Sequence, residues 1–385
     1  TIRYMVAEVQ HGGRVTDDFD KRMMRTYASV WLESSIFRPG FAFYKGYEIP
    51  DGKNIQEYRD FVDNLPLIDT PEIFGMHSNA QLSFSSASAE SILATILDVQ
   101  PKESGGAGGE TAEDVVLRMS KDLLGKLPRD YIKTSVSASI KKIGGQTPLN
   151  ICLSQEIDRM QILLSLMRRT MTDLQLAIAG TVIMTPELQE ALVSLYDSRV
   201  PPRWLRASWD SPILGYWFAD VIARCKQFSE WLAGGRPNVF WLTGFFNPQG
   251  FLTAMKQENT RAHQGWALDN VNLTTEVLKA EREDIKKSPE EGVYVYGLFL
   301  EGAGWDKKLG ALRESQPKVL FQQMPVIWFS AASGAVGGES KYYVCPLYRL
   351  PRRTALTYVC EVTLKTTKPA EHWTLRGVAL LSSTS

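Results

Sequence analysis

The feature of this sequence that most suggests chemistry is a glycine-rich stretch at residues 104–109, SGGAGG. A phosphate-binding P-loop needs the pattern G-x-x-x-x-G-K-[ST], because its backbone N–H groups, its lysine and its hydroxyl each contact a phosphate or Mg²⁺. Here the glycines lead into Glu110 and Thr111, and a carboxylate at that point would repel phosphate. We therefore interpret residues 104–109 as a flexible linker and expect no nucleotide site in this chain.

An acidic cluster near the N-terminus is the next candidate for a binding site. Asp17, Asp18 and Asp20 would supply carboxylates to a divalent cation if they pointed to one place. Adjacent residues on a helix point to different faces, and no further acidic ligand lies nearby in the sequence. We interpret the aspartates as residues that complement the positive end of a helix dipole, with Thr16 as the capping residue.

The cysteines and histidines are too scattered to predict a metal or catalytic site. A zinc site needs clustered Cys or His ligands, and a hydrolase of the α/β class would show a G-x-S-x-G elbow, which is missing. The residues concerned are Cys152, Cys225, Cys345 and Cys360, and His11, His77, His263 and His372. We expect reduced thiols, and no catalytic residue, no cofactor-binding residue and no metal ligand.

Aromatic residues are plentiful, and five tryptophans fall between residues 204 and 241. Stacked rings can bind bases, but nucleic-acid binding also needs interleaved basic residues, which are few here. The 43 Lys+Arg and 43 Asp+Glu cancel, which argues against a general nucleic-acid or polybasic membrane-surface protein. We expect the tryptophans to pack between helices. A basic turn at Arg349, Arg352 and Arg353 is interpreted as a solvated hairpin, with a partner contact left open.

Helical periodicity is clearest after Pro148. Apolar residues recur there at alternating intervals of four and three, which places them on one face of a long helix. They are Leu153, Ile157, Met160, Leu164, Met167, Met171, Leu174 and Ile178. Further helices are expected at 19–32, 55–65, 91–99, 111–126, 186–195, 209–232, 248–263 and 273–286.

The composition changes at Gly292, where short segments rich in β-branched and aromatic residues begin to alternate with turn residues. The expected strands are 292–301, 318–329, 341–348, 356–366 and 373–381. This spacing predicts an antiparallel sheet or a small barrel. The expected fold class is α+β, with helical regions followed by an antiparallel β-barrel-like domain.

The length of 385 residues predicts about two or three domains. No run of about 18 apolar residues predicts a membrane-spanning helix, and the first residues lack the features of a signal peptide. Because the sequence does not begin with Met, we expect it to be a piece of a longer polypeptide with a structural or interaction role.

Several strings resemble dynein heavy chains. Residues 8–22 (EVQHGGRVTDDFDKR) are similar to the last AAA+ lid of that family, and residues 71–80 (PEIFGMHSNA) to its P-E-x-F-G-x-H-x-N-A motif. Five further stretches resemble the extreme C-terminal domain of that family. They are residues 240–253 (FWLTGFFNPQGFLT), 292–306, 317–321, 324–328 and 372–381. Residues 101–106 and 351–357 are most similar to the outer-arm gamma-type heavy chain of cilia and flagella. The resemblance covers essentially the whole chain.

The resemblance implies a division into three parts. Residues 1–90 would be the AAA+ lid of the sixth module, residues 91–290 the helical part of the C-terminal domain, and residues 291–385 its β-barrel-like cap. The sixth module of that family binds no nucleotide, which agrees with the missing P-loop, so this region would be no enzyme and would hold no cofactor. ATP and Mg²⁺ would bind in other modules of the parent chain. Arg14 would have a structural pairing role, and the helix from Leu153 to Ile178 would span neighbouring modules.

The implied function is that of a non-catalytic structural and regulatory region of an axonemal dynein heavy chain. The parent would be an ATP-driven microtubule motor that bends cilia and flagella, and this region would brace the AAA+ ring and tune motility. The alternative is a docking surface for other axonemal proteins. The implied partners are the rest of the ring and, through the parent chain, dynein subunits and microtubules, but no nucleic acid and no membrane. The implied location is the cytoplasm and cytoskeleton, in the axoneme of a cilium or flagellum.

Overall fold

The computed structural model describes residues 1–11, 13–43, 47–77, 79–99, 111–211, 213–334 and 341–384. The chain forms two compact units that alternate along the sequence. Unit 1 comprises residues 1–99, 298–325 and 337–384, and unit 2 comprises residues 100–297 and 326–336. The expected linker at residues 104–109 lies outside the described residues.

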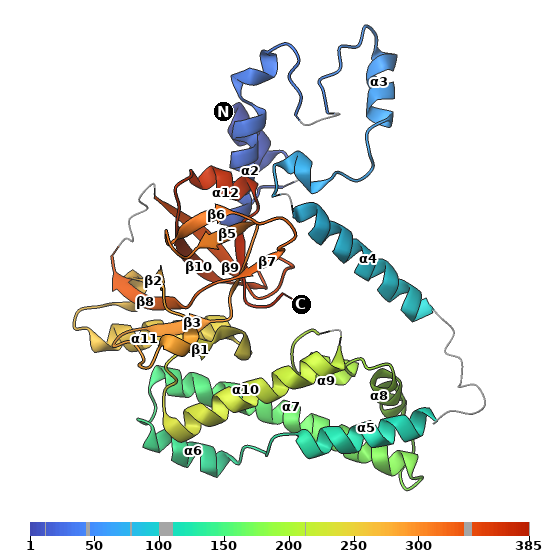
Figure 1. Ribbon diagram of the computed structural model, residues 1–385, viewed down its shortest axis with the longest axis vertical. Coiled ribbons are helices and arrows are strands. Elements are labelled where there is room, and N and C mark those ends of the chain that lie inside the picture. Colours follow the sequence, from blue (N-terminus) through green and yellow to red (C-terminus); the bar gives the residue numbers. More distant parts are fainter. Residues whose placement is uncertain are drawn as a thin grey trace. The chain divides into compact units, whose positions relative to one another are not determined.

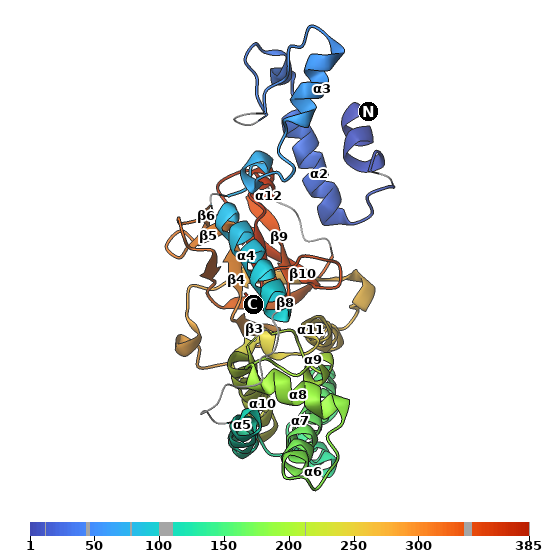
Figure 2. The same cartoon turned by 90° about the vertical axis from the view of Figure 1, so that its right-hand side faces the viewer.

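Unit 2 contains a bundle of helices around one long central helix. These helices are α5 (Ala112–Lys126), α6 (Lys133–Lys142), α7 (Pro148–Ile178), α8 (Pro186–Tyr196), α9 (Pro202–Arg206), α10 (Leu214–Gly234) and α11 (Pro248–Ala262). α7 begins where Thr147 accepts a hydrogen bond from the N–H of Asn150 and Pro148 occupies the first turn. Figures 1 and 2 show α7 with α5, α8 and α10 packed along it.

The apolar stripe predicted on α7 is buried inside unit 2. Seven of its eight residues, Leu153 through Leu174, are at most 1% exposed, because α5, α8, α10 and α11 pack around them. The 31 residues give α7 a length of about 46 Å at 1.5 Å per residue. The apolar face of α7 thus stabilises its own unit, and the hypothesis that the helix spans neighbouring modules stays a prediction, since the opposite face of α7 is exposed at Ile151 and Ile162.

The tryptophans of unit 2 pack between helices, as expected. Trp204, Trp217 and Trp231 are fully buried, and the rings of Trp204 and Trp217 stack with centroids 5.6 Å apart. The Arg224 guanidinium lies 3.5 Å from the centroid of the Trp209 ring, a cation–π contact in the interior. These rings contribute to the core.

The sheet of unit 2 has the strand order β1-β3-β8-β2. Its strands are β1 (Phe240–Trp241), β2 (Val271–Val277), β3 (Val293–Tyr296) and β8 (Ile327–Ser333). β1 pairs parallel with β3, and the other pairs are antiparallel. The helix expected at 273–286 is wrong, because all seven residues of β2 pair with β8 and four of them, Val271, Thr274, Thr275 and Val277, are β-branched.

The first hundred residues of unit 1 are helical segments joined by loops. They are α1 (Ile2–Tyr4), η1 (Met5–Val9), α2 (Asp18–Trp31), η2 (Ser34–Phe37), α3 (Ile55–Asp63), η3 (Pro71–Phe74) and α4 (Ala80–Val99). α2 and α3 lie where the sequence predicted them. α4 is longer than the expected helix at 91–99, because the Ser/Ala-rich stretch before it is also helical.

The remaining strands of unit 1 form a five-stranded and a two-stranded sheet. The strands are β4 (Phe299–Glu301), β5 (Ala303–Asp306), β6 (Ala311–Glu314), β7 (Phe321–Gln323), β9 (Tyr342–Tyr348), β10 (Tyr358–Lys365) and β11 (Ala379–Leu381). The order of the larger sheet is β10-β9-β11-β4-β7, and β5 pairs with β6. Figure 1 shows α12 (Ala370–Leu375) against this part and next to α2.

The α+β class is confirmed, but the β region differs from the expected antiparallel barrel. Among the described residues no sheet closes, and the pairs β1–β3 and β11–β9 are parallel. The strand expected at 318–329 is divided between β7 in unit 1 and β8 in unit 2, with Pro325 between them. The strand expected at 373–381 begins as α12, because Pro369 precedes a helical start and Gly377, at φ +65°, ends it. None of the described helices is long and apolar enough to cross a membrane.

Candidate functional site: the contacts between the N-terminal helices and the sheet of unit 1

The His, Cys, Asp and Glu side chains of the described residues do not gather into a metal-binding cluster. No three His, Cys, Asp or Glu side chains among them are placed to hold a metal ion. Burial raises the pKa of Cys152 and Cys345 to about 12 and that of Cys225 to about 11. These thiols stay protonated near neutral pH and are poor nucleophiles.

The acidic cluster Asp17, Asp18 and Asp20 begins α2, as expected, but the capping residue is Asp17 and not Thr16. The Asp17 carboxylate accepts hydrogen bonds from the N–H groups of Phe19 (2.9 Å) and Asp20 (3.0 Å). Asp18 pairs with Lys21 at 3.0 Å. Arg14 is exposed and makes no ion pair within the described ranges, so its expected pairing role is not seen there.

Asn79 connects the start of α4 to the turn that precedes β7. Its side chain is buried, and it donates to the carbonyls of Gln316 (2.7 Å) and Val319 (3.0 Å). Its carbonyl oxygen accepts the N–H of Lys318 at 2.8 Å. One amide thus makes three hydrogen bonds to a backbone segment about 240 residues away. Met76 and His77 belong to the same segment, just before Asn79.

The segment before Asn79 is held by residues that follow α12. Arg376 donates to the carbonyl of Met76 at 3.2 Å. A Cβ on Gly377 would come within 2.9 Å of the Met76 Cε, so the backbone lies close to this methionine. His77 is buried, and burial lowers its pKa; the charges of Arg353 and Arg376 lower it further, whereas Glu301 opposes them. The imidazole is therefore neutral near pH 7.

A second contact ties α2 to the sheet. Arg22 donates to the carbonyl of Val344 at 2.6 Å and to the hydroxyl of Tyr343 at 3.2 Å. Its guanidinium also lies over the rings of Phe19 (4.8 Å) and Tyr343 (5.0 Å). The Tyr343 hydroxyl in turn donates to the carbonyl of Val378 at 2.9 Å, which links β9 to β11. α2 is thus fixed by charge-assisted and cation–π contacts.

The basic turn predicted near Arg349 lies between β9 and β10, where one of its arginines is an internal link. Arg353 donates to the carbonyl of Gly377 (2.7 Å) and pairs with Glu301 at 2.6 Å. Arg352 is exposed. The solvated-hairpin interpretation therefore holds for part of this turn only.

A neighbouring carboxylate, Glu314, contacts three basic side chains. Its oxygens lie 2.5 Å from Lys368, 2.7 Å from His372 and 3.6 Å from Arg376. Burial raises the pKa of Glu314, but these partners outweigh burial, so the pKa lies below its ordinary value. The cluster fixes α12 to β6.

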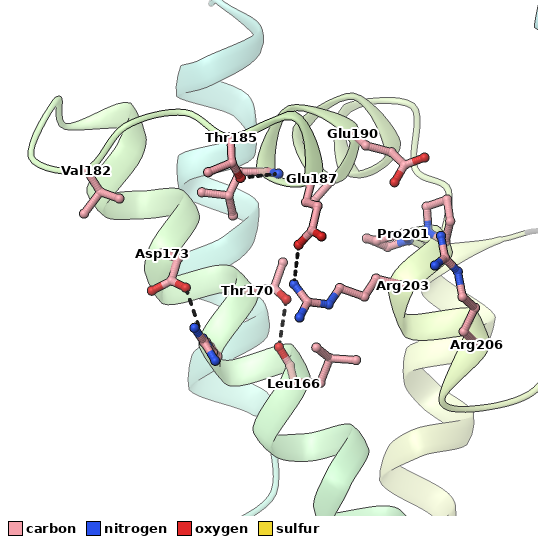
Figure 3. A pocket seen from close by; sticks show the side chains of 14 residues that line it. Leu166, Thr170, Asp173, Val182, Thr185, Glu187, Glu190, Pro201, Arg203 and Arg206 are labelled. Carbon is pink, nitrogen blue, oxygen red and sulfur yellow. Dashed lines mark hydrogen bonds and ion pairs between the residues drawn. The ribbon is translucent and has the colours of Figure 1, made fainter.

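Unit 2 has a cavity of about 330 Å³ between α7, α8 and α9, which the sequence did not point to. Figure 3 shows Arg203 reaching across it to Glu187, at 2.7 Å, and Asp173 bonded to an arginine, Arg169, at 3.5 Å. The Thr170 hydroxyl donates to the Leu166 carbonyl. Arg203 and Arg169 thus each pair with a carboxylate of the same unit. The arrangement lacks the nucleophile and adjacent base of a hydrolytic site.

The contacts of unit 1 left only weak signals in the sequence. The string PEIFGMHSNA is similar to a family motif, but nothing in it reveals that the Asn79 side chain forms hydrogen bonds to a turn near residue 318. A partner so distant in the sequence becomes visible only in the fold. The one local signal was Pro317, because proline favours the second position of a β-turn.

These features define a module of helices and sheets whose described parts are joined by internal polar contacts, and two family models match it. The model of the C-terminal domain of dynein heavy chains matches residues 86–382, and the model of the AAA lid domain of dynein heavy chains matches residues 1–80. The protein belongs to the dynein heavy chain family.

The similar proteins are axonemal. The chain is 53% identical to human dynein axonemal heavy chain 8 over 99% of its length. It is 39% identical to the Chlamydomonas reinhardtii dynein gamma chain of the flagellar outer arm, and 33% identical to the ciliary dynein beta chain of Tripneustes gratilla. It spans about 8–9% of the length of these relatives. Their names support an axonemal, cytoskeletal location in a cilium or flagellum.

Proposed function

We propose that this chain is a non-catalytic structural and regulatory region of an axonemal dynein heavy chain. The parent chain would be an ATPase that moves along microtubules and bends a cilium or flagellum, with ATP and Mg²⁺ bound in other modules. This region would brace the AAA+ ring and tune motility. Its partners would be the rest of the ring in the same chain and, through the parent, dynein subunits and microtubules.

The observation that carries this proposal is that the lid helices and the five-stranded sheet share unit 1. The family models divide the chain between residues 80 and 86. The contacts of Asn79, Arg22 and Arg376 cross that division, and each joins an N-terminal helical segment to the later sheet region. A displacement of the lid would therefore move the sheet with it. Such a mechanical link suits a region that transmits ring movement.

The test is to replace Arg22 by Ala in the complete heavy-chain motor. This change removes the bonds to Val344 and Tyr343 and leaves every residue outside unit 1 untouched. We expect ATP turnover to stay within about twofold of the parent while microtubule gliding velocity changes by more than that. Both would be measured on the same preparations.

The matched control is Arg59→Ala, on the exposed surface of α3 in the same unit. It removes an equal charge without touching the sheet, and gliding should be unchanged. If Arg22→Ala measurably loosens α2 in hydrogen exchange and gliding is still unaltered, the coupling role is wrong. If both variants change velocity alike, the effect comes from charge and not from the contact.

The alternative of a docking surface is supported by the tip of the β9–β10 hairpin. Leu356 is 93% exposed there. The tip is nonetheless ordered by its own bonds, since the Thr357 hydroxyl donates to the Arg352 carbonyl at 2.7 Å and accepts the N–H of Thr354 at 2.9 Å. A rigid turn that presents one apolar side chain suits a small contact with another protein.

Leu356→Asp in the complete motor tests this alternative. We expect gliding of the isolated motor to be unchanged and incorporation into dynein-depleted axonemes to fall. Deleting residues 292–385 is a poorer test, because that segment supplies strands to both units. Full incorporation of Leu356→Asp would contradict a docking role for this tip.

A further inference from the structure

The turn that Asn79 contacts has an unusual backbone. Residues 316–319 form a β-turn closed by a hydrogen bond from the N–H of Val319 to the carbonyl of Gln316, at 3.1 Å. Pro317 takes the second position and Lys318 the third, with φ +66°. A positive φ at the third position after proline defines a type II turn, and that position favours glycine or asparagine. Lys318 is therefore in a left-handed conformation that its Cβ disfavours.

Asn79 contacts the polar backbone groups that define this turn. Its amide donates to the carbonyls of the first and fourth residues, Gln316 and Val319, and accepts from the N–H of the third, Lys318. All of these side-chain bonds go to the turn and none to the first turn of α4, although Asn79 occupies the capping position there, where its backbone carbonyl accepts the N–H of Ser83. The amide thus matches the strained geometry and holds it.

The side chains of the turn itself do not supply this restraint. Gln316, Pro317, Lys318 and Val319 are all exposed. Because Asn79 is buried and lies at the start of α4, the restraint comes from the N-terminal helical segment and not from the sheet. A strained residue that persists because one distant side chain holds it will relax when that side chain moves away.

We infer that the turn 316–319 is a strained catch, in which Asn79 keeps Lys318 left-handed and release of Asn79 lets the turn relax. The connection between α4 and β7 then has an engaged and a released state. The regulatory meaning of these states rests on the proposed function, whereas the catch itself depends only on Asn79 and the turn.

Hydrogen exchange of the complete heavy-chain motor tests the catch at the amides of residues 318 and 319. We expect Asn79→Ala to speed exchange at both by about tenfold or more, because the buried acceptor and donors are lost. Lys318→Gly should slow exchange at Val319 about fivefold, the size of the left-handed penalty less the added freedom of glycine. In the double variant, glycine should restore much of the protection that Asn79→Ala removes.

The matched control is Lys308→Gly, in the β5–β6 turn. The N–H of Lys308 is also bonded to a side-chain oxygen, that of the Asp306 carboxylate, but its φ is not positive. At that position glycine should speed exchange, which is the opposite of the effect expected for Lys318→Gly. If Lys318→Gly also speeds exchange, or if Asn79→Ala leaves residues 318 and 319 unchanged, the catch is wrong. Lys318→Gly is expected to stabilise the turn, so this part of the test does not depend on a variant that fails to fold.

Gliding velocity of the same variants separates the catch from the proposed function. If exchange responds as expected and velocity does not change, the catch stands and the regulatory role fails. If exchange does not respond, the catch fails whatever the velocity. If both respond, with Lys318→Gly and Asn79→Ala shifting velocity in opposite directions, the released state is the one that alters motility.

Discussion

The α7 bundle of unit 2 and the N-terminal helices of unit 1 hold their positions in different ways. α7 buries a continuous apolar face, from Leu149 to Leu174, against neighbouring helices. α3 buries no residue at all, and its Ile55 and Val62 are 73% and 61% exposed. α2 buries three residues. The bundle is thus stabilised by area removed from water, and the N-terminal helices depend more on a few polar contacts.

This difference has a consequence for how each region would respond to load. Apolar burial is not directional, so a bundle of this kind resists many small distortions together. The contacts of Asn79 and Arg22 are directional, and each is lost when its few atoms separate by roughly an ångström or two. Helices held in this way can disengage without unfolding a core, which fits the regulatory role proposed above.

The largest expected effect breaks the bundle itself. Leu164→Ala removes a fully buried side chain from α7 and should lower the free energy of opening of that helix by about 3 kcal/mol. Ile162→Ala, two residues away and 62% exposed, should cost less than about 0.5 kcal/mol. Hydrogen exchange across α7 measures both. Equal costs would mean that the apolar face of α7 does not stabilise the bundle.

A smaller effect is expected from one hydroxyl in unit 1. Tyr343→Phe removes the hydroxyl that donates to the Val378 carbonyl and one of the two acceptors of the Arg22 guanidinium, and should cost about 1–2 kcal/mol. The loss should appear in exchange of both α2 and β11, because the hydroxyl links them. Tyr342→Phe, on the neighbouring and 40% exposed residue, is the control and should change neither. If only β11 loosens, the hydroxyl does not help to hold α2.

The helices could be predicted from the sequence where the pattern was long and local. The stripe from Leu153 to Ile178 and the proline at position 148 located α7 to within a few residues. β2 was missed because it runs into a charged segment, and its strand state depends on pairing with β8, whose residues lie 50 or more positions later in the chain. The division of residues 318–329 between two sheets also depends on distant partners. Such non-local pairing leaves no periodic signal in one sequence.

The contacts of the candidate site were beyond prediction for the same reason. His77 and Asn79 stood in a recognised string, yet their surroundings come from residues 301–376. The expected absence of catalytic, cofactor and metal residues stays a prediction, as does the three-part division at residues 90 and 290. The sequence did reveal family membership, because long similar strings identify a family even where the role of each single residue is not evident.

The stability of unit 1 should depend on pH through His77. The pKa of His77 lies below its ordinary value of 6.5 in the fold, mainly because of burial. Below about pH 6.5 the unfolded chain therefore binds more protons than the native state, so stability is fully present above that pH and falls as the pH drops. The slope can reach about 1.4 kcal/mol per pH unit. Exchange of residues 80–83 between about pH 7.5 and 5.5, corrected for the intrinsic rate, measures it.

His77→Gln should remove this slope, whereas His11→Gln, which changes an exposed imidazole of the same unit, should keep it. Glu301→Gln should leave the onset of the loss near pH 6.5 and extend the loss to still lower pH, because Glu301 is the group that raises the pKa of His77 in the fold. A slope that survives in His77→Gln would assign the acid sensitivity to another group. A unit 1 that becomes more stable toward acidic pH would contradict the sign.

The smallest effect concerns the start of α2, where the predicted and the observed capping residues are neighbours. Asp17→Ala removes the acceptor of the Phe19 and Asp20 N–H groups and should cost about 1 kcal/mol. Thr16→Ala should cost close to nothing. Exchange in the first turn of α2 distinguishes them, and a larger effect of Thr16→Ala would restore the cap that the sequence favoured. Because α2 is held through Arg22, one turn further on, a frayed start should also loosen the Arg22 contact, whereas fraying at Thr147 in unit 2 would leave the core of α7 in place.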